Sequence, residues 1–305
     1  MLPDSLVSTS SVSESAYTGR FAPSPTGPLH FGSLLAAVAS YLDARSHQGR
    51  WLLRIEDLDP PREDPNAVPH ILQTLESCAL YWDGDIRYQS QRGEAYEACL
   101  HSLTERGLAF PCSCSRKQLG SGLHLGRCAY PGGECAWRFL VGSGIESFQD
   151  QLQGLQHFSL DQEIGDFVIR RRDHLWSYQL AVVCDDIDQG MTHVMRGIDL
   201  IDSTPRQQVL YRALGARIPV WSHIPVAVER NGQKLSKQNL ALPLNPAASA
   251  DNLWLALQWL QQQPPAALRG ASPAELLSWA IPNWQPQQLA GQQQMPAPDH
   301  FRQPA

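Results

Sequence analysis

Two short segments carry residues suited to binding a polyphosphate, and the first is GRFAPSPTGPLHFGS, residues 19–33. A proline-stiffened loop here precedes a predicted helix that has His30, Gly32 and Ser33 at its start. The free N–H groups and positive dipole end of a helix N-terminus favour phosphate. Gly32 lets a flat base approach the backbone, and His30 can donate to a phosphate oxygen. A proline-rich loop before an ordinary helix is the alternative.

The second segment is Lys234-Leu235-Ser236-Lys237-Gln238, called the lysine loop below. Only three of the 24 Lys and Arg residues are lysines, and two of them share this loop, the third being Lys117. Compact ammonium groups on a mobile loop can close on a polyphosphate and stabilise a charged transition state. A solvated polar loop is the alternative.

The cysteines suggest a metal site rather than disulfides. The chain has 7 Cys, an odd number, and four of them lie within residues 112–135: Cys112, Cys114, Cys128 and Cys135. In a cytoplasmic protein such a cluster is typical of metal binding, and thiolates bind Zn²⁺ well. Reduced cysteines without a metal are the alternative.

Composition limits the class of protein. A length of 305 residues predicts about two domains, and 43% hydrophobic with 18% charged residues is typical of a globular chain. A net charge of −6 argues against a nucleic-acid binder that is basic over its whole surface. Residues 1–16 have no basic residue and no apolar core, which predicts a mobile tail and a cytoplasmic protein. No apolar run is long enough to span a membrane.

Hydrophobic periodicity places these residues on a βαβ unit. A strand at 17–22, an amphipathic helix ending near Gly49 and a buried strand at 51–55 predict the start of a parallel sheet. Further predicted elements are helices at 68–80, 94–106, 204–214, 253–262 and 274–280, and strands at 194–196 and 224–228. Asp185-Asp186 is predicted to be a cap or a fold-stabilising pair. The Gln- and Pro-rich end, residues 285–305, is predicted to be a frayed tail.

The ordered motifs resemble those of the class I aminoacyl-tRNA synthetases. His30-Phe31-Gly32-Ser33 resembles the HIGH signature, and the lysine loop resembles KMSKS, with Leu235 and Gln238 as departures. The segments 20–32, 54–59 (RIEDLD) and 196–200 (RGIDL) resemble blocks of the glutamyl-tRNA synthetases. Together the blocks cover residues 17–240 in the order found in that family.

The resemblance implies a fold and a domain plan. It implies an α/β class I catalytic domain of Rossmann type, with a parallel sheet, in residues 17–90 and 175–240. It implies an inserted, acceptor-binding-like zinc subdomain in residues 91–174. Residues 241–305 are expected to form a helical C-terminal region with a Gln/Pro-rich tail and no anticodon-binding domain.

Within the family the chain resembles the short paralogue that glutamylates queuosine, the modified wobble base of tRNA(Asp). The chain ends about 65 residues after the lysine loop, and residues 241–305 hold two basic residues against three acidic ones. Val182 stands where full-length glutamyl enzymes tend to carry Asn. The cysteine cluster also falls where the paralogue has its zinc site. A monomer is expected.

The resemblance implies that glutamate attacks ATP to form an adenylate, with Mg²⁺ on the phosphates. Catalysis is then expected from His30, Lys234 and Lys237, and ATP binding from His30, Gly32, Ser33 and Lys237. The substrate α-ammonium needs an anion such as Glu56, for which a surface salt bridge to Arg54 or Arg62 is the alternative. The side-chain carboxylate needs donors such as Arg20, Tyr178 and Arg196. The resemblance implies the same glutamate-binding set: Arg20, Phe21, Ala22, Pro23, Ser24, Glu56, Tyr178 and Arg196.

For zinc the resemblance implies Cys112, Cys114, Tyr130 and Cys135. The spacing from Tyr130 to Cys135 is one residue longer than the pattern, so Cys128 can replace Tyr130 and give a four-cysteine site.

Three rival functions stay open. The first is a truncated glutamyl-tRNA synthetase that charges tRNA(Glu), and the second is a non-catalytic tRNA-binding paralogue. The third is a nucleotidylyltransferase that acts on another small acid.

Overall fold

The computed structural model describes residues 16–119, 122–128, 133–235 and 241–302. Of the predicted tail, residues 1–16, only Ala16 is described. Lys237 and Tyr130 also lie outside the described residues. None of the helices in these ranges is long and apolar enough to span a bilayer.

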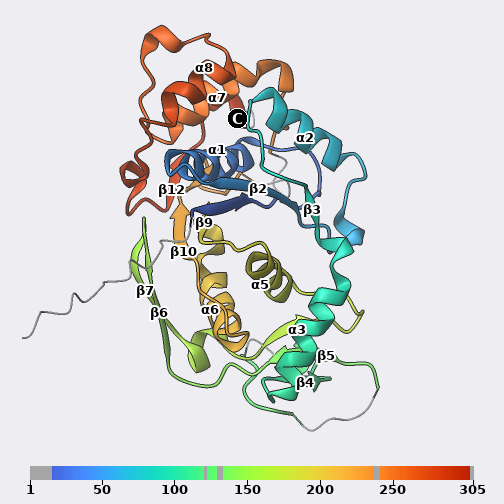
Figure 1. Ribbon diagram of the computed structural model, residues 1–305. Coiled ribbons are helices and arrows are strands. Elements are labelled where there is room, and N and C mark those ends of the chain that lie inside the picture. Colours follow the sequence, from blue (N-terminus) through green and yellow to red (C-terminus); the bar gives the residue numbers. More distant parts are fainter. Residues whose placement is uncertain (1–15, 120–121, 129–132, 236–240, 303–305) are drawn as a thin grey trace, which may run out of the picture.

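Helices and strands alternate along most of the chain (Figure 1). The helices are α1 (Phe31–Ser46), α2 (Ala67–Ser77), α3 (Gly93–Glu105), α4 (Arg116–Leu119), α5 (Tyr178–Asp188), α6 (Thr204–Ala213), α7 (Ser249–Trp259) and α8 (Pro273–Ala280). The strands are β1 (Thr18–Phe21), β2 (Arg50–Ile55), β3 (Arg87–Tyr88), β4 (Ala109–Cys112), β5 (Ala136–Phe139), β6 (Ile145–Asp150), β7 (Gly154–Ser159), β8 (Phe167–Arg170), β9 (His193–Gly197), β10 (Val220–Ile224), β11 (Val226–Val228) and β12 (Gln294–Pro296).

The central sheet is parallel, as the βαβ pattern predicts. β1 pairs with β2, β2 with β3, and β9 with β10, all in parallel. β9 lies beside β1, where the amide of Thr192 donates to the carbonyl oxygen of Thr18 at 3.0 Å. The spatial order β3-β2-β1-β9-β10 is that of a doubly wound α/β sheet, whose ligands bind at the carboxyl ends of the strands. The predicted parallel α/β sheet is confirmed.

Two cores lie on the two faces of this sheet. α1, α7 and α8 pack together on one face, and α5 and α6 cover the other (Figure 1). Residues 51–55 of β2 are all buried, which suits a parallel strand covered on both faces. The strands that carry the candidate site residues are therefore rigidly held.

The segment between β3 and α5 adds two further β structures. β4, β5 and β8 form a small antiparallel sheet. The β6–β7 hairpin extends the central sheet, because β6 pairs in parallel with β10 through Asp150 and Trp221.

Two sequence expectations are wrong. The strand predicted over 224–228 is divided at Pro225, which has no N–H, and its halves continue different strands, β10 and β11. The predicted frayed end is ordered through residue 302: β12 pairs with β11, and Phe301 is buried against Phe31 with ring centroids 4.2 Å apart. A few apolar residues, Leu289, Ala297 and Phe301, anchor a segment whose average composition suggests a tail.

Candidate active site

The candidate residues converge where the strands of the central sheet end. Arg20 lies on β1, Glu56 directly follows β2, and Arg196 lies near the end of β9. Tyr178 begins α5, and His30 is the N-cap of α1. This is the crevice at which open α/β sheets bind their ligands.

His30 and Ser33 fix the start of α1 by a reciprocal capping interaction. The His30 ring accepts from the amide of Ser33 through Nδ1 at 3.4 Å, and Ser33 Oγ accepts from the His30 amide at 2.8 Å. A ring that accepts at Nδ1 carries its proton on Nε2. A side chain on Gly32 would come within 3.1 Å of the His30 ring and 3.6 Å of the Leu235 carbonyl oxygen. The lysine loop backbone therefore lies close to the α1 N-terminus.

The described part of the lysine loop is tied to the segment after β9. Lys234 Nζ lies 2.5 Å from Oδ2 of Asp199, which belongs to the RGIDL motif. Asp199 also approaches its own loop closely, because a Cβ on Gly197 would lie 2.4 Å from Asp199 Oδ1. A larger residue at 197 would therefore displace the flexible Asp199 side chain from this position.

Asp186, for which the sequence predicts either a cap or a fold-stabilising role, is a buried anchor. It accepts from Arg20 at 3.1 and 3.2 Å and from Arg54 Nη1 at 2.6 Å, and all three side chains are at most 4% exposed. Burial favours the protonated acid, but the charges of Arg20 and Arg54 outweigh it and lower the pKa of Asp186. The contacts therefore support a fold-stabilising role for Asp186. Arg20 donates to it through Nε and Nη2.

Arg196 is a buried cation whose partners are all neutral. Its guanidinium donates to His223 Nε2 at 3.0 Å, the Tyr178 hydroxyl at 3.4 Å, Thr204 Oγ1 at 2.9 Å and the Leu200 carbonyl oxygen at 3.3 Å. Among the described residues, no carboxylate lies within 4.0 Å of it, although it is 5% exposed. Burial, aided by the charge of Arg20, lowers its pKa.

His223 holds Arg196 in place from behind. His223 Nδ1 lies 2.6 Å from Oδ2 of Asp150, and both side chains are fully buried. Burial lowers the pKa of His223 despite its bond to Asp150, so the ring is neutral, with its proton on Nδ1 and a lone pair toward Arg196.

Glu56 lies at the end of β2, and its charge and that of Arg196 both act on Tyr178. Its amide donates to the Pro23 carbonyl oxygen at 3.0 Å, which ties the end of β2 to the proline-rich loop. Its Oε1 lies 3.5 Å from Arg54 Nη2. Burial raises the pKa of Glu56, against the charges of Arg54 and Arg20. The alternative for Glu56 was a surface salt bridge to Arg54 or Arg62. The structure shows a contact with Arg54, but that arginine is buried.

The rest of the expected glutamate set lies along the same loop. Phe21 is buried and stacks on Trp51, Pro23 is buried, Ala22 is half-buried, and Ser24 is exposed.

The structure brings together four possible zinc ligands. Sγ of Cys112, Cys114 and Cys128 and a ring nitrogen of His124 all lie within 4.8 Å of one another. Sulfur ligands around a tetrahedral zinc are about 3.8 Å apart, so this Cys₃His set fits Zn²⁺ in both spacing and chemistry. The polar atoms around the cluster fit as well. His124 Nδ1 faces Asp166 Oδ2 at 3.3 Å, and Arg138 Nε donates to Cys112 Sγ at 3.3 Å.

This cluster differs from the set expected from the resemblance. Cys112 and Cys114 are common to both, and Cys128 is the replacement considered for Tyr130. His124 was not considered, and Cys135 is not part of the group. Cys135 directly precedes β5, whose first residue, Ala136, is the cross-strand partner of Cys112.

The important residues that sequence reasoning missed are Arg54, Asp150, His223 and His124. Arg54 stands within the RIEDLD block and was named only as a surface partner of Glu56, and the sequence carried no signal for the other three. Their contacts span 12 to 132 residues, from His124–Cys112 to Arg54–Asp186, and local sequence patterns do not reveal them.

Known proteins identify the family. Residues 17–124 and 124–252 match the family of class I tRNA synthetases (E and Q), catalytic domain. A glutamyl-Q tRNA(Asp) synthetase of Pseudomonas entomophila is 50% identical over 293 residues, which cover 94% of this chain and 99% of the relative. The protein of the same name from Neisseria meningitidis serogroup B is 48% identical, covering 88% and 95%.

Solved structures show the same fold. The glutamate tRNA ligase of Elizabethkingia meningosepticum, in complex with its amino acid, matches with a TM-score of 0.78 and 21% identity, over 93% of this chain and 68% of that one. The glutamate-tRNA synthetase of Elizabethkingia anophelis matches with a TM-score of 0.75. The family expected from the motifs is therefore confirmed, and the chain belongs to the class I glutamyl and glutaminyl tRNA synthetases and, within them, to the glutamyl-Q tRNA(Asp) synthetases.

Proposed function

We propose that this chain activates L-glutamate with ATP in the absence of tRNA and then transfers it to the queuosine of tRNA(Asp). The observation that carries the proposal is Arg196, a buried guanidinium among neutral partners at the carboxyl ends of the parallel strands. Burial of a charge without a counterion is costly, so such a site favours an anionic ligand. The side-chain carboxylate of glutamate supplies that anion. The Tyr178 hydroxyl, which contacts Arg196, can donate to the same carboxylate.

The remaining groups of the substrate have matching partners in the same crevice. Glu56 offers a carboxylate to the α-ammonium, and Arg20 and Arg54 on Asp186 keep that side of the crevice rigid. A site with a cation at one end and an anion at the other selects an amino acid with an acidic side chain.

Activation places the α-carboxylate of glutamate on the α-phosphorus of ATP. A carboxylate oxygen forms the new P–O bond, the bond to the β-phosphate breaks, and pyrophosphate leaves. Negative charge builds on the phosphate oxygens, and the α1 N-terminus and His30 Nε2–H are placed to stabilise it. Gly32, Ser33 and the two loop lysines, Lys234 and Lys237, complete the ATP site, and Mg²⁺ binds with the phosphates.

Transfer uses a hydroxyl of the queuosine cyclopentenediol as the nucleophile. Its oxygen attacks the carbonyl carbon of the adenylate, an ester bond forms, AMP leaves, and the hydroxyl proton is released to solvent. The crevice then recognises the anticodon loop directly.

We also propose the domain plan and the zinc site. The catalytic domain comprises residues 17–90 and 175–240, with a zinc subdomain in residues 91–174. Cys112, Cys114, His124 and Cys128 would hold Zn²⁺, which would stabilise the small β4-β5-β8 sheet because Cys112 ends β4. Metal analysis of His124→Ala and Cys135→Ala separates this set from the one with Tyr130 and Cys135.

The test is glutamate-dependent ATP–pyrophosphate exchange without tRNA. Exchange with glutamate, but not with aspartate or glutamine, supports the proposal, and Lys237→Ala should abolish it. Exchange only after addition of tRNA(Glu) would indicate a truncated glutamyl-tRNA synthetase instead. A lack of exchange under every condition would indicate a non-catalytic tRNA-binding protein.

A further inference from the structure

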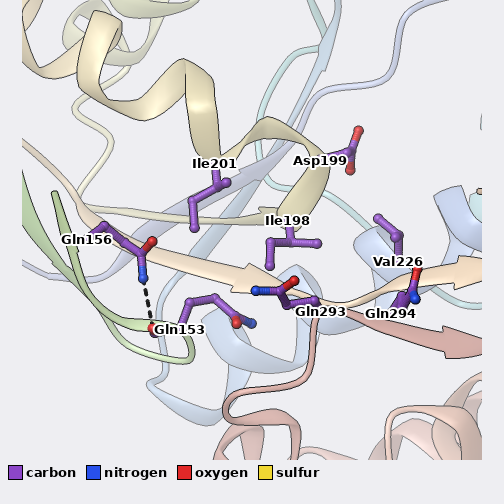
Figure 2. Close-up of a pocket in the computed structure, with 8 residues that line it drawn as sticks. All are labelled: Gln153, Gln156, Ile198, Asp199, Ile201, Val226, Gln293 and Gln294. Carbon is purple, nitrogen blue, oxygen red and sulfur yellow. Dashed lines mark hydrogen bonds between the residues drawn. The ribbon is translucent and has the colours of Figure 1, made fainter. Parts of the chain in front are cut away.

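A cavity of about 410 Å³ lies next to the candidate active site and contains none of the residues assigned to ATP or glutamate. Figure 2 shows its lining, in which four glutamines face three aliphatic side chains and Asp199. We call it the glutamine cavity, and its lining residues are Gln153, Gln156, Ile198, Asp199, Ile201, Val226, Gln293 and Gln294. Its volume lies in the range of small-ligand sites.

The glutamine cavity adjoins the proposed glutamate site through shared contacts. Ile198 follows Arg196 by two residues. Gln153 Nε2 donates to the His223 carbonyl oxygen at 2.8 Å, and the ring of that histidine contacts Arg196 at 3.0 Å. Asp199, on the far side, is bonded to Lys234. A group in the cavity would thus lie beside the activated glutamate.

The lining favours a nucleobase over a phosphate or a sugar–phosphate backbone. No Lys or Arg is among the lining residues, and the Lys234 ammonium that reaches the lining is paired with Asp199, so the lining itself offers phosphate no cation. Primary amides donate and accept at once, which suits the edge of a heterocycle, and Ile198, Ile201 and Val226 can pack on its faces.

Two of the amides are available to a ligand. The Gln293 and Gln294 side chains are exposed at the rim and make no hydrogen bond to another described residue. Gln153 and Gln156 are partly used by the protein: Gln156 Nε2 donates to the Gln153 carbonyl oxygen at 2.8 Å (Figure 2).

We propose that the glutamine cavity receives the modified wobble base of tRNA(Asp), flipped out of the anticodon loop, with its cyclopentenediol ring toward the carbonyl carbon of the adenylate. This inference rests on the proposed function. Enzymes that do chemistry on a base take it out of the stack and recognise its edge by hydrogen bonds. Here those bonds come from Gln293 and Gln294, and the glutamines select the base that carries the acceptor hydroxyl.

The test compares exchange with transfer in one set of variants. Gln293→Leu combined with Gln294→Leu removes two hydrogen-bonding groups at constant size, and Ile201→Trp fills the cavity. We expect pyrophosphate exchange within twofold of the unmodified protein, and glutamate transfer to queuosine-containing tRNA(Asp) reduced by roughly tenfold or more. Gln73→Leu, on the exposed face of α2, is the matched control and should change neither activity.

Binding of tRNA gives a second readout. The unmodified protein should bind tRNA(Asp) with queuosine more tightly than the same tRNA with guanosine at the wobble position, and the double glutamine variant should bind both equally. A raised KM for ATP in the double variant would overturn the proposal, because the cavity would then hold the adenine of ATP. Unchanged transfer in both cavity variants would overturn it as well. Absence of exchange in the unmodified protein would instead refute the proposed function.

Discussion

Replacing Arg196 should weaken glutamate binding much more than it weakens the fold. Four of the five N–H groups of Arg196 donate to protein acceptors, so one is left for the substrate carboxylate. A hydrogen bond between charged groups contributes about 1.5–3 kcal/mol. At about 1.4 kcal/mol per tenfold, Arg196→Met should raise the KM for glutamate by about one to two orders of magnitude. Arg196→Lys keeps the charge but loses the planar fork, so its KM should be intermediate.

Pyrophosphate exchange at varied glutamate concentration measures this effect. Thermal unfolding gives an independent readout, because glutamate at about one hundred times its Kd should stabilise the unmodified protein by about 2.7 kcal/mol. Arg196→Met should lose that stabilisation at the same glutamate concentration. Arg269→Met, at an exposed arginine in the C-terminal region, is the matched control. A KM for glutamate within threefold of normal in folded Arg196→Met would refute the assignment of Arg196 to the substrate carboxylate.

Three further predictions concern the anchor, the metal and the C-terminus. Asp186→Asn should lower the free energy of unfolding at pH 7 by about 3–5 kcal/mol, because it removes the charge that pairs with Arg20 and Arg54 and leaves Arg54 only the longer contact with Glu56. Since the pKa of Asp186 is lowered on folding, its contribution to the free energy of unfolding is present above about pH 4 and is lost as pH falls through the folded pKa. The denaturation curves of the unmodified protein and the variant should therefore converge in acid. A difference that stays constant with pH would contradict this. His124→Ala should reduce bound zinc measured by mass spectrometry, with Cys135→Ala unaffected; loss of zinc in the second variant alone would contradict the cluster. Phe301→Ala should destabilise the protein by about 3 kcal/mol in chemical unfolding, and no change would show that the C-terminal segment does not anchor α1.

Local patterns in the sequence were sufficient for the elements that build the crevice. The βαβ unit around α1 was predicted because its periodicities change from strand to helix and back within about 40 residues. The split at Pro225 was missed because the apolar residues on its two sides read as one continuous run. Two short strands joined in this way have the same hydrophobic pattern as a single strand. The order of the C-terminal segment was missed because composition is an average, whereas a few buried side chains such as Phe301 decide whether a segment packs.

The candidate site was predictable in part for the same reason. Arg196, Glu56 and His30 stand in ordered motifs, so their positions could be quoted from the sequence alone. The network that holds them could not, because Asp186 meets Arg20 across 166 residues and His223 meets Asp150 across 73. The same holds for His124, whose approach to the cysteines depends on how the loop after β4 folds back.

The central claim is that glutamate is activated here for transfer to a modified base. The most direct measurement offers radiolabelled glutamate and ATP to three acceptors: tRNA(Asp) with queuosine, tRNA(Asp) with guanosine at the wobble position, and tRNA(Glu). Label should appear on the first alone, and it should remain there after the 3′-terminal adenosine has been removed. Label on tRNA(Glu), or label that leaves with the terminal adenosine, would contradict the account.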